Sequence, residues 1–187
     1  MKRITSTKGE YGIGYEMSGS EIRDIQGLLA NRNAQLSTMR AQNLNMTEHK
    51  MEFVKNIRGI DFINDAASVN ANGIYMALSN LQKKAVWITA FEQWGEVGNQ
   101  FAEMMEFIKT KITSVVFVGS ETSPSRTIIE GMDIPTEHAA DMESAVRTAF
   151  YSAGINQSVL FSPGATDIFG EGISQSGDSF KSAVAQL

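Results

Sequence analysis

The sequence predicts an α/β fold in which helices cover a mostly parallel sheet. Strand-like and helix-like segments alternate from residue 59 to residue 187, an order typical of a layered domain with right-handed crossovers. Apolar residues make up 42% of the 187 residues and charged residues 20%, a balance that supports a folded core. This length fits one domain plus an appendage.

The composition excludes several classes of protein. A net charge of −5 argues against a broad nucleic-acid or anionic-membrane surface, and no apolar stretch approaches the roughly 18–20 residues that span a bilayer. The absence of cysteine excludes disulfides, thiolate zinc sites and a cysteine nucleophile, and two histidines are too few for a histidine-rich metal site. The first residues lack the apolar core of a secretory signal. We therefore expect a cytoplasmic protein without a metal site and without a nucleic-acid or membrane partner.

The first 45 residues predict an arm and an amphipathic helix. Residues 1–19 are rich in Gly, Ser, Thr and Lys, and residues 18–21 (SGSE) have the spacing of a capping box. Apolar residues then recur at helical spacing, which predicts a helix over about 20–42. This helix either packs on its own domain or serves as a docking or dimerisation helix. Its apolar stripe consists of Ile22, Ile25, Leu28, Leu29, Leu36 and Met39.

Hydrophobic patterns predict the remaining elements in order. Residues 51–57 and 60–63 alternate apolar and polar side chains around Arg58-Gly59, which predicts a hairpin with a tight turn.

Ligands in parallel sheets bind where strands end at their carboxyl side, so we expect a site among three loops: residues 64 onward, 91–98 and 162–172. After the hairpin we predict a helix from Val69 to Leu81, a buried strand at 85–90, a helix at 101–109, a strand at 113–118, a helix at 138–152, a buried strand at 157–161 and a helix at 175–187.

Four segments carry a more specific signal. They are residues 48–54 (EHKMEFV), 64–70 (NDAASVN), 86–95 (VWITAFEQWG) and 158–169 (SVLFSPGATDIF), the last followed by GDSF at 177–180. In this order and at these spacings they resemble the C-terminal, amino-acid-binding domain of the bacterial Mur ligases, closest to the D-glutamate-adding type. The family pattern reads E-H-R-(L/M)-E-x-V, N-D-S-K-A-T-N, a G-G-K-D-K-G-like loop and S-P-x-x-A-S-F-D-x-F. The resemblance covers residues 46–187 and leaves residues 1–45 outside it.

The resemblance implies a Rossmann-like, three-layer domain with a mixed sheet. Intact enzymes of the family have three domains: the first binds a UDP-sugar, the central one holds ATP and magnesium on a P-loop, and the C-terminal one holds the amino acid whose amine attacks an acyl-phosphate. This chain contains no G-x-x-x-x-G-K-(S/T), so the resemblance implies ATP and magnesium only if a central domain accompanies it. No catalytic residue is assigned. Carried over residue by residue, the positions that bind substrate, with D-glutamate as the candidate ligand, are Asn64, Asp65, Asn70, Ser162 and Phe169.

The sequence departs from the family where cations are expected. The lysine and threonine of N-D-S-K-A-T-N are Ala67 and Val69, and the arginine before Gly177 is Ser176. Two like charges 4 Å apart cost about 4 kcal/mol at an effective dielectric of 20, so a carboxylate in place of a lysine would repel a dianionic amino acid. In the G-G-K-D-K-G-like loop, the glycines become Ala90 and Phe91, the first lysine Glu92 and the second Trp94.

Each retained position also has a structural interpretation. Asn64-Asp65 could cap the following helix, Ser162-Pro163 could be a strand-ending turn, and Phe169 could be a core residue.

Two hypotheses for function follow. The first is a stand-alone, non-catalytic domain with a binding or assembly role, an expectation that Met1 and the capped helix favour. The alternative is the D-glutamate-binding part of a peptidoglycan-precursor ligase, acting with a separate ATP-binding chain or as a fragment of a longer enzyme. In that case Arg58, Lys83 or Lys84 would replace the lost lysines.

A partner is expected through the N-terminal helix. Without a central domain, the inner face of this domain would expose an apolar patch, and such patches tend to become interfaces. We expect the helix at about 20–42 to cover this patch on the same chain or in a two-fold homodimer. The patch would consist of Phe91, Trp94, Ile168 and Phe169.

Overall fold

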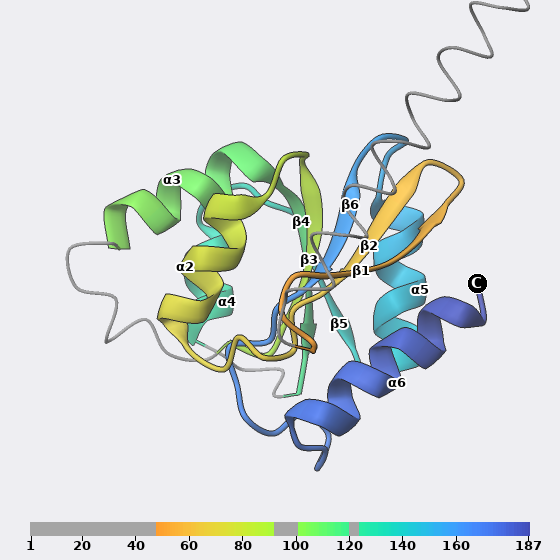
Figure 1. Ribbon diagram of the computed structural model, residues 1–187. Helices are drawn as coiled ribbons and strands as arrows, with labels where there is room; N and C mark the ends of the chain where they lie inside the picture. The colour runs from red at the N-terminus through yellow and green to blue at the C-terminus, as the bar shows by residue number, and fades with distance from the viewer. Residues whose placement is uncertain (1–47, 92–100, 120–123) are drawn as a thin grey trace, which may run out of the picture. The chain divides into compact units, whose positions relative to one another are not determined.

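The computed structural model describes residues 48–91, 101–119 and 124–187 (Figure 1). Every described residue belongs to one compact unit. The predicted arm and helix, and Trp94 in the loop at 91–98, lie outside the described residues.

The sheet has six strands in the order β1-β2-β6-β3-β4-β5. β1 pairs antiparallel with β2 and all other pairs are parallel, so the predicted mostly parallel, mixed sheet is confirmed. The last strand in the sequence, β6, lies in the interior of the sheet between β2 and β3. The strands are β1 (Glu52–Ile57), β2 (Ile60–Asn64), β3 (Ala85–Thr89), β4 (Ile112–Val118), β5 (Thr136–Ala139) and β6 (Ser158–Phe161).

Helices cover both faces of this sheet, which confirms the Rossmann-like three-layer fold. Figure 1 shows α2 (Ala71–Asn80), α3 (Phe101–Lys111) and α4 (Pro124–Glu130) on one side and α5 (Met142–Ser152) and α6 (Ile173–Ala185) on the other. Side chains of a strand point alternately to opposite faces, and two cores result. Trp87 and Leu160 pack in the core under α2 and α3, whereas Ile88 and Phe161 pack in the core under α5 and α6.

The predicted hairpin is also confirmed, because β1 and β2 pair antiparallel with Ile57 opposite Ile60. Its turn residues Arg58 and Gly59 both have positive φ, 51° and 85°, as the two central residues of a type I′ turn require. Glycine reaches this conformation without the steric cost that other residues meet.

The structure corrects the prediction for residues 120–152. α4 and β5 were not predicted, and the helix predicted from residue 138 begins at Met142. His138 belongs to β5, which pairs with β4. Asp141 starts the helix because its carboxylate accepts a hydrogen bond from the Ser144 amide at 2.7 Å and the Ser144 hydroxyl completes a capping box.

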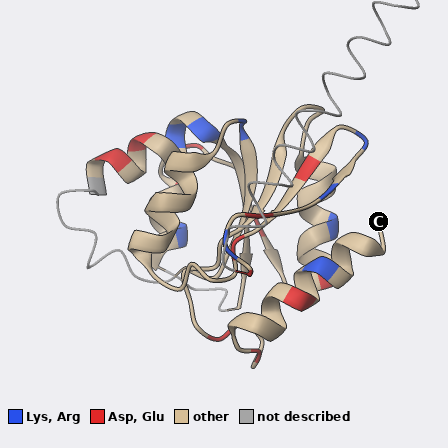
Figure 2. Cartoon of the chain, in the orientation of Figure 1, with Lys and Arg blue, Asp and Glu red and all other residues tan. Residues whose placement is uncertain are grey.

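Charged residues of both signs follow each other along the outer helices. Figure 2 shows the acidic residues of α3 toward its start and the basic residues toward its end, and α6 carries Asp178 followed by Lys181. Among the described helices, none is long and apolar enough to cross a membrane.

Candidate functional site

A cleft of about 470 Å³ opens where the parallel strands end at their carboxyl side. Segments that follow β2, β3, β4 and β6 form its walls, so the site lies at the edge of the sheet that the sequence predicted. Its described lining consists of Val69, Asn70, Ala71, Ala90, Phe91, Val118, Gly119, Gly164, Ala165, Thr166, Asp167, Ile168 and Phe169.

Gly164 lets the loop after β6 approach the other walls closely. Its φ is +68°, and a Cβ at this position would lie 2.7 Å from Cδ2 of Phe91. The loop is held there by backbone hydrogen bonds: the Gly164 amide donates to Ser68 O at 2.7 Å and the Ala90 amide donates to Pro163 O at 3.0 Å. A side chain at residue 164 would therefore push this wall of the cleft outward.

Two of the five predicted site residues, Asn70 and Phe169, line the cleft. Asn70 is the N-cap of α2, and its Oδ1 accepts a hydrogen bond from the Gly73 amide at 2.9 Å. Phe169 is 39% exposed and has φ of 58°, a region that bulky residues rarely adopt. The interpretation of Phe169 as a core residue is therefore wrong.

The other three predicted residues, Asn64, Asp65 and Ser162, lie behind the cleft and are fully buried. The Ser162 hydroxyl donates to Asp65 Oδ2 at 2.8 Å, and the Met51 amide donates to Asp65 Oδ1 at 3.1 Å. Because Asn70 caps α2, the interpretation of Asn64-Asp65 as the cap of this helix is wrong. Asn64, Asp65 and Ser162 thus connect the segments that form the cleft and are not among the residues that line it.

Lys50 is a cation beside the buried Asp65, behind the cleft, that we did not predict from the sequence. Its Nζ lies 3.4 Å from Asp65 Oδ1 and donates to the Ser68 hydroxyl at 2.6 Å. Burial raises the pKa of Asp65, although hydrogen bonds from Ser68, Ser162 and Met51 and the charge of Lys50 counteract part of this shift. A signal was present, since Lys50 stands at the arginine position of the E-H-R pattern.

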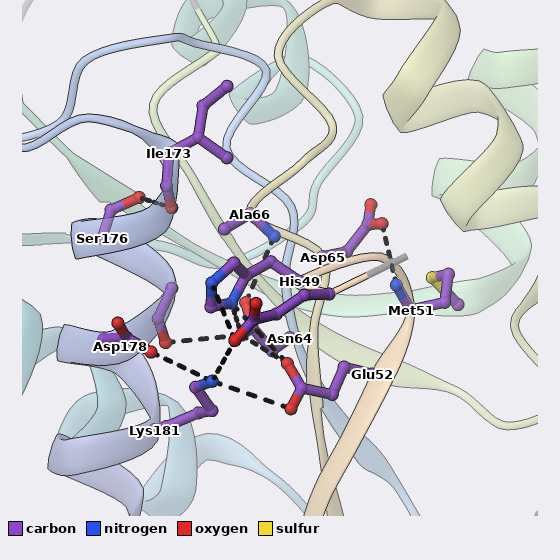
Figure 3. Close-up of polar contacts among 12 residues, drawn as sticks. His49, Met51, Glu52, Asn64, Asp65, Ala66, Ile173, Ser176, Asp178 and Lys181 are labelled. Atoms are coloured by element: carbon purple, nitrogen blue, oxygen red, sulfur yellow. Dashed lines mark hydrogen bonds and ion pairs between the residues drawn. The ribbon is translucent and has the colours of Figure 1, made fainter. Parts of the chain in front are cut away.

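Asn64 joins the turn before β1, β1 itself and α6 (Figure 3). Its Nδ2 lies 2.9 Å from His49 Nδ1 and donates to Glu52 Oε2 at 3.1 Å and to Gly177 O at 3.3 Å. Its Oδ1 accepts a hydrogen bond from the Ala66 amide at 3.2 Å, which fixes the orientation of the carboxamide.

The three predicted replacement cations lie at the wrong end of the sheet. Arg58 precedes β2, and Lys83 and Lys84 precede β3, so all three are at the amino ends of strands whose carboxyl ends form the cleft. Lys83 pairs with Asp61 instead. Among the described residues that line the cleft, Asp167 is the one charged side chain.

The predicted apolar patch is largely absent from the described surface. Phe91 and Ile168 are each 2% exposed because they pack into the two cores. Phe169 alone of the described members is substantially exposed.

Comparison with known proteins gives the family. Residues 49–164 match the family model described as Mur ligase, glutamate ligase domain. A UDP-N-acetylmuramoylalanine--D-glutamate ligase from Bacteroides fragilis is 31% identical over 94% of this chain and 37% of its own length. A ligase of the same name from Pelodictyon phaeoclathratiforme is 33% identical over 96% of this chain and 34% of its own. Each alignment leaves out at most 6% of the 187 residues, which is far fewer than 45. Both alignments therefore extend into residues 1–45.

Among solved structures, a bifunctional folylpolyglutamate synthase/dihydrofolate synthase from Yersinia pestis CO92 is similar over 76% of this chain and 32% of that one, at 14% identity and a TM-score of 0.48. The chain spans about a third of the length of the curated relatives it matches. From the family model and these two ligases, the chain belongs to the Mur ligase family, with which it shares the glutamate ligase domain.

Proposed function

We propose that this chain is a binding domain of the Mur ligase type that does not catalyse ligation by itself. One observation carries the proposal: the described lining of the cleft contains a carboxylate, Asp167, and no lysine or arginine. D-Glutamate brings two carboxylates, and at an effective dielectric of 20 a like charge 4 Å away costs about 4 kcal/mol. The geometry of a small-molecule cleft is present without the positive charge that the two carboxylates of glutamate need.

ATP and magnesium fit the described residues equally poorly. A triphosphate calls for cations and backbone donors, but the sequence has no G-x-x-x-x-G-K-(S/T) and Lys50 is engaged by Asp65 and Ser68. Under this proposal, ATP and magnesium enter only with a separate central domain.

Calorimetry and a phosphate assay test the proposal. We expect no heat when D-glutamate is titrated to millimolar concentration into the purified chain. We also expect no phosphate release with ATP, magnesium, D-glutamate and UDP-MurNAc-L-alanine, while the Bacteroides fragilis relative, assayed in parallel, provides the positive control. Phosphate release by this chain that depends on glutamate would overturn the proposal.

The identity to two D-glutamate ligases favours a second candidate. In it, the chain is the D-glutamate-binding part of a peptidoglycan-precursor ligase that acts with a separate ATP-binding chain or within a longer enzyme. Saturable D-glutamate binding that strengthens in Asp167→Asn would support it, because that substitution removes the repelling carboxylate from the cleft.

A further inference from the structure

A second group of ionisable side chains lies where the Glu48–Met51 turn meets β1 and α6. Figure 3 shows Lys181 reaching from α6 toward the carboxylates around it. Its Nζ lies 3.0 Å from Asp178, 3.7 Å from Glu48 and 3.8 Å from Glu52. Three carboxylates against one ammonium leave a net charge of −2 when the neighbouring imidazole of His49 is counted as neutral.

His49 adds an unpaired nitrogen to this charged group. The residue is 4% exposed, and its buried Nε2 makes no hydrogen bond. The nearest acidic oxygen, Glu48 Oε1, is 3.8 Å away, which is too far for a hydrogen bond. Buried polar atoms in native proteins nearly always have a partner, so an unpaired nitrogen among carboxylates indicates a missing ligand.

We propose that Glu48, His49 and Asp178 bind a divalent transition-metal ion, with Zn²⁺ preferred. One ligand atom from each residue lies within 4.8 Å of the others. Zn²⁺ with nitrogen and oxygen ligands at about 2.0–2.1 Å in tetrahedral geometry holds neighbouring donors about 3.3 Å apart. The donors must therefore close by up to about 1.5 Å. The Glu48 and Asp178 side chains can move this far because they are 73% and 61% exposed. Water would fill the fourth position.

Ligation through Nε2 of His49 requires the proton to sit on Nδ1, and two neighbours of Nδ1 have to shift for this. Such a histidine carries its proton on Nδ1, which donates to a second acceptor. Glu52 Oε2 lies 3.6 Å from Nδ1, so it takes this role only after the two atoms close by about half an ångström to hydrogen-bond distance. In the structure Asn64 Nδ2 lies 2.9 Å from Nδ1 and can only donate to it, so a proton on Nδ1 requires the Asn64 amide to move away from the ring and to keep its two hydrogens on Glu52 and Gly177 O.

Lys181 competes with the metal ion. Its ammonium contacts two of the three ligands, Asp178 and Glu48, and has to withdraw toward Glu52 when the ion binds. Removal of this ammonium is therefore expected to tighten metal binding at this site. Metal binding to surface carboxylates elsewhere on the protein would not respond to the change, so the two kinds of binding can be distinguished.

Calorimetric titration of ZnCl₂ and MnCl₂ into the chelator-treated full chain tests the proposal. We expect one equivalent to bind, Zn²⁺ more tightly than Mn²⁺. Asp178→Asn and Glu48→Gln should each weaken Zn²⁺ binding at least tenfold, and Lys181→Met should tighten it severalfold. Glu143→Gln, which replaces an exposed carboxylate on α5, is the matched control and should leave the affinity unchanged.

Melting temperature gives a second measurement. Zn²⁺ should raise the Tm of the natural chain, because the ion ties the turn at residues 48–49 to α6, and should leave Asp178→Asn unaffected. The fold should survive both substitutions of exposed side chains, and circular dichroism checks this. No binding at millimolar Zn²⁺, or equal affinity in the natural chain, Asp178→Asn and Glu48→Gln, would overturn the site. Neither outcome depends on what the cleft binds.

Discussion

Asp65 is buried behind the cleft, and burial raises its pKa above the ordinary 3.8. In the interval between 3.8 and the raised folded-state value, the folded protein keeps a proton that the unfolded chain has released. Protonated Asp65 is therefore compatible with the fold at low pH, and stability falls as pH rises through this interval.

We predict that Asp65→Asn removes this pH dependence. The unfolding free energy of the natural chain minus that of the variant should decrease as pH rises from 3.8, by at most about 1.4 kcal/mol per pH unit. Urea unfolding at a series of pH values measures it. Hydrogen bonds lower the pKa values of Asp141, Asp178 and Glu130, and these groups make the unfolding free energy rise with pH. Both proteins contain these residues, so their contribution cancels in the difference between the two unfolding free energies. A difference that grew with pH would contradict the burial argument.

Phe169 holds a left-handed backbone at the mouth of the cleft, with φ of 58°. An L-residue in this region costs roughly 1–2 kcal/mol, whereas glycine adopts it freely. We predict that Phe169→Gly is more stable than Phe169→Ala by about 1 kcal/mol, since both lose the ring and only glycine relieves the strain. Urea midpoints at unchanged m-value decide the question. Equal stability would show that the backbone relaxes once the ring is removed.

At the scale of elements, α6 packs against the turn before β1 through Gly177. A Cβ on this residue would lie 2.7 Å from Cγ of His49, closer than real side chains approach. Helix propensity alone favours alanine over glycine by about 1 kcal/mol, but overpacking costs about 1–3 kcal/mol.

We predict that Gly177→Ala lowers the free energy of unfolding despite its better helix propensity. Ser182→Ala, on an exposed position of the same helix, is the control and should gain a few tenths of a kcal/mol. Chemical denaturation of the three proteins gives the comparison. A stabilised Gly177→Ala would mean that His49 does not lie under the helix as described.

Elements with a strong apolar pattern could be predicted from the sequence, and short elements without one could not. The helices α2 and α6 have apolar periodicity, the strands β3 and β6 are apolar runs, and the hairpin has a turn at Arg58-Gly59. β5 has four residues and α4 seven, too few for either period to be distinguished, so tertiary pairing with β4 decides the conformation of β5.

The cleft lies at the edge of the sheet where we expected a site, but three of the five predicted residues lie behind it. Residues that follow a strand can turn into the core or toward the cleft, and the path of the loop decides which. Asp65 turns inward to Ser162, whereas Asn70 reaches the cleft after five more residues. Lys50 could not be placed from spacing alone, because the fold of the β1–β2 hairpin brings it back to Asp65.

At the scale of the whole molecule, we predict that the amphipathic stripe at residues 20–42 makes the chain a homodimer. Phe91 and Ile168 are buried in their own domain, so the stripe needs another apolar surface, and a second copy of itself provides one. Light scattering should report a dimer for the full chain and a monomer for a chain that starts at Thr47. A monomer in both cases, with equal melting temperature, would show that the extension neither dimerises nor shields the domain.

The interior position of β6 has a consequence for synthesis on the ribosome. β1 and β2 leave the exit tunnel before β3, β4 and β5. The two groups of strands are joined only by β6, so they stay separate until residues 158–161 are translated. A nascent chain that ends before this point exposes the facing edges of β2 and β3, and such unpaired edges invite association with other chains. Pairing across this sequence distance is also slow. Ribosome stalling or a premature stop codon between residues 119 and 157 would thus release a product that chaperones or proteases must handle.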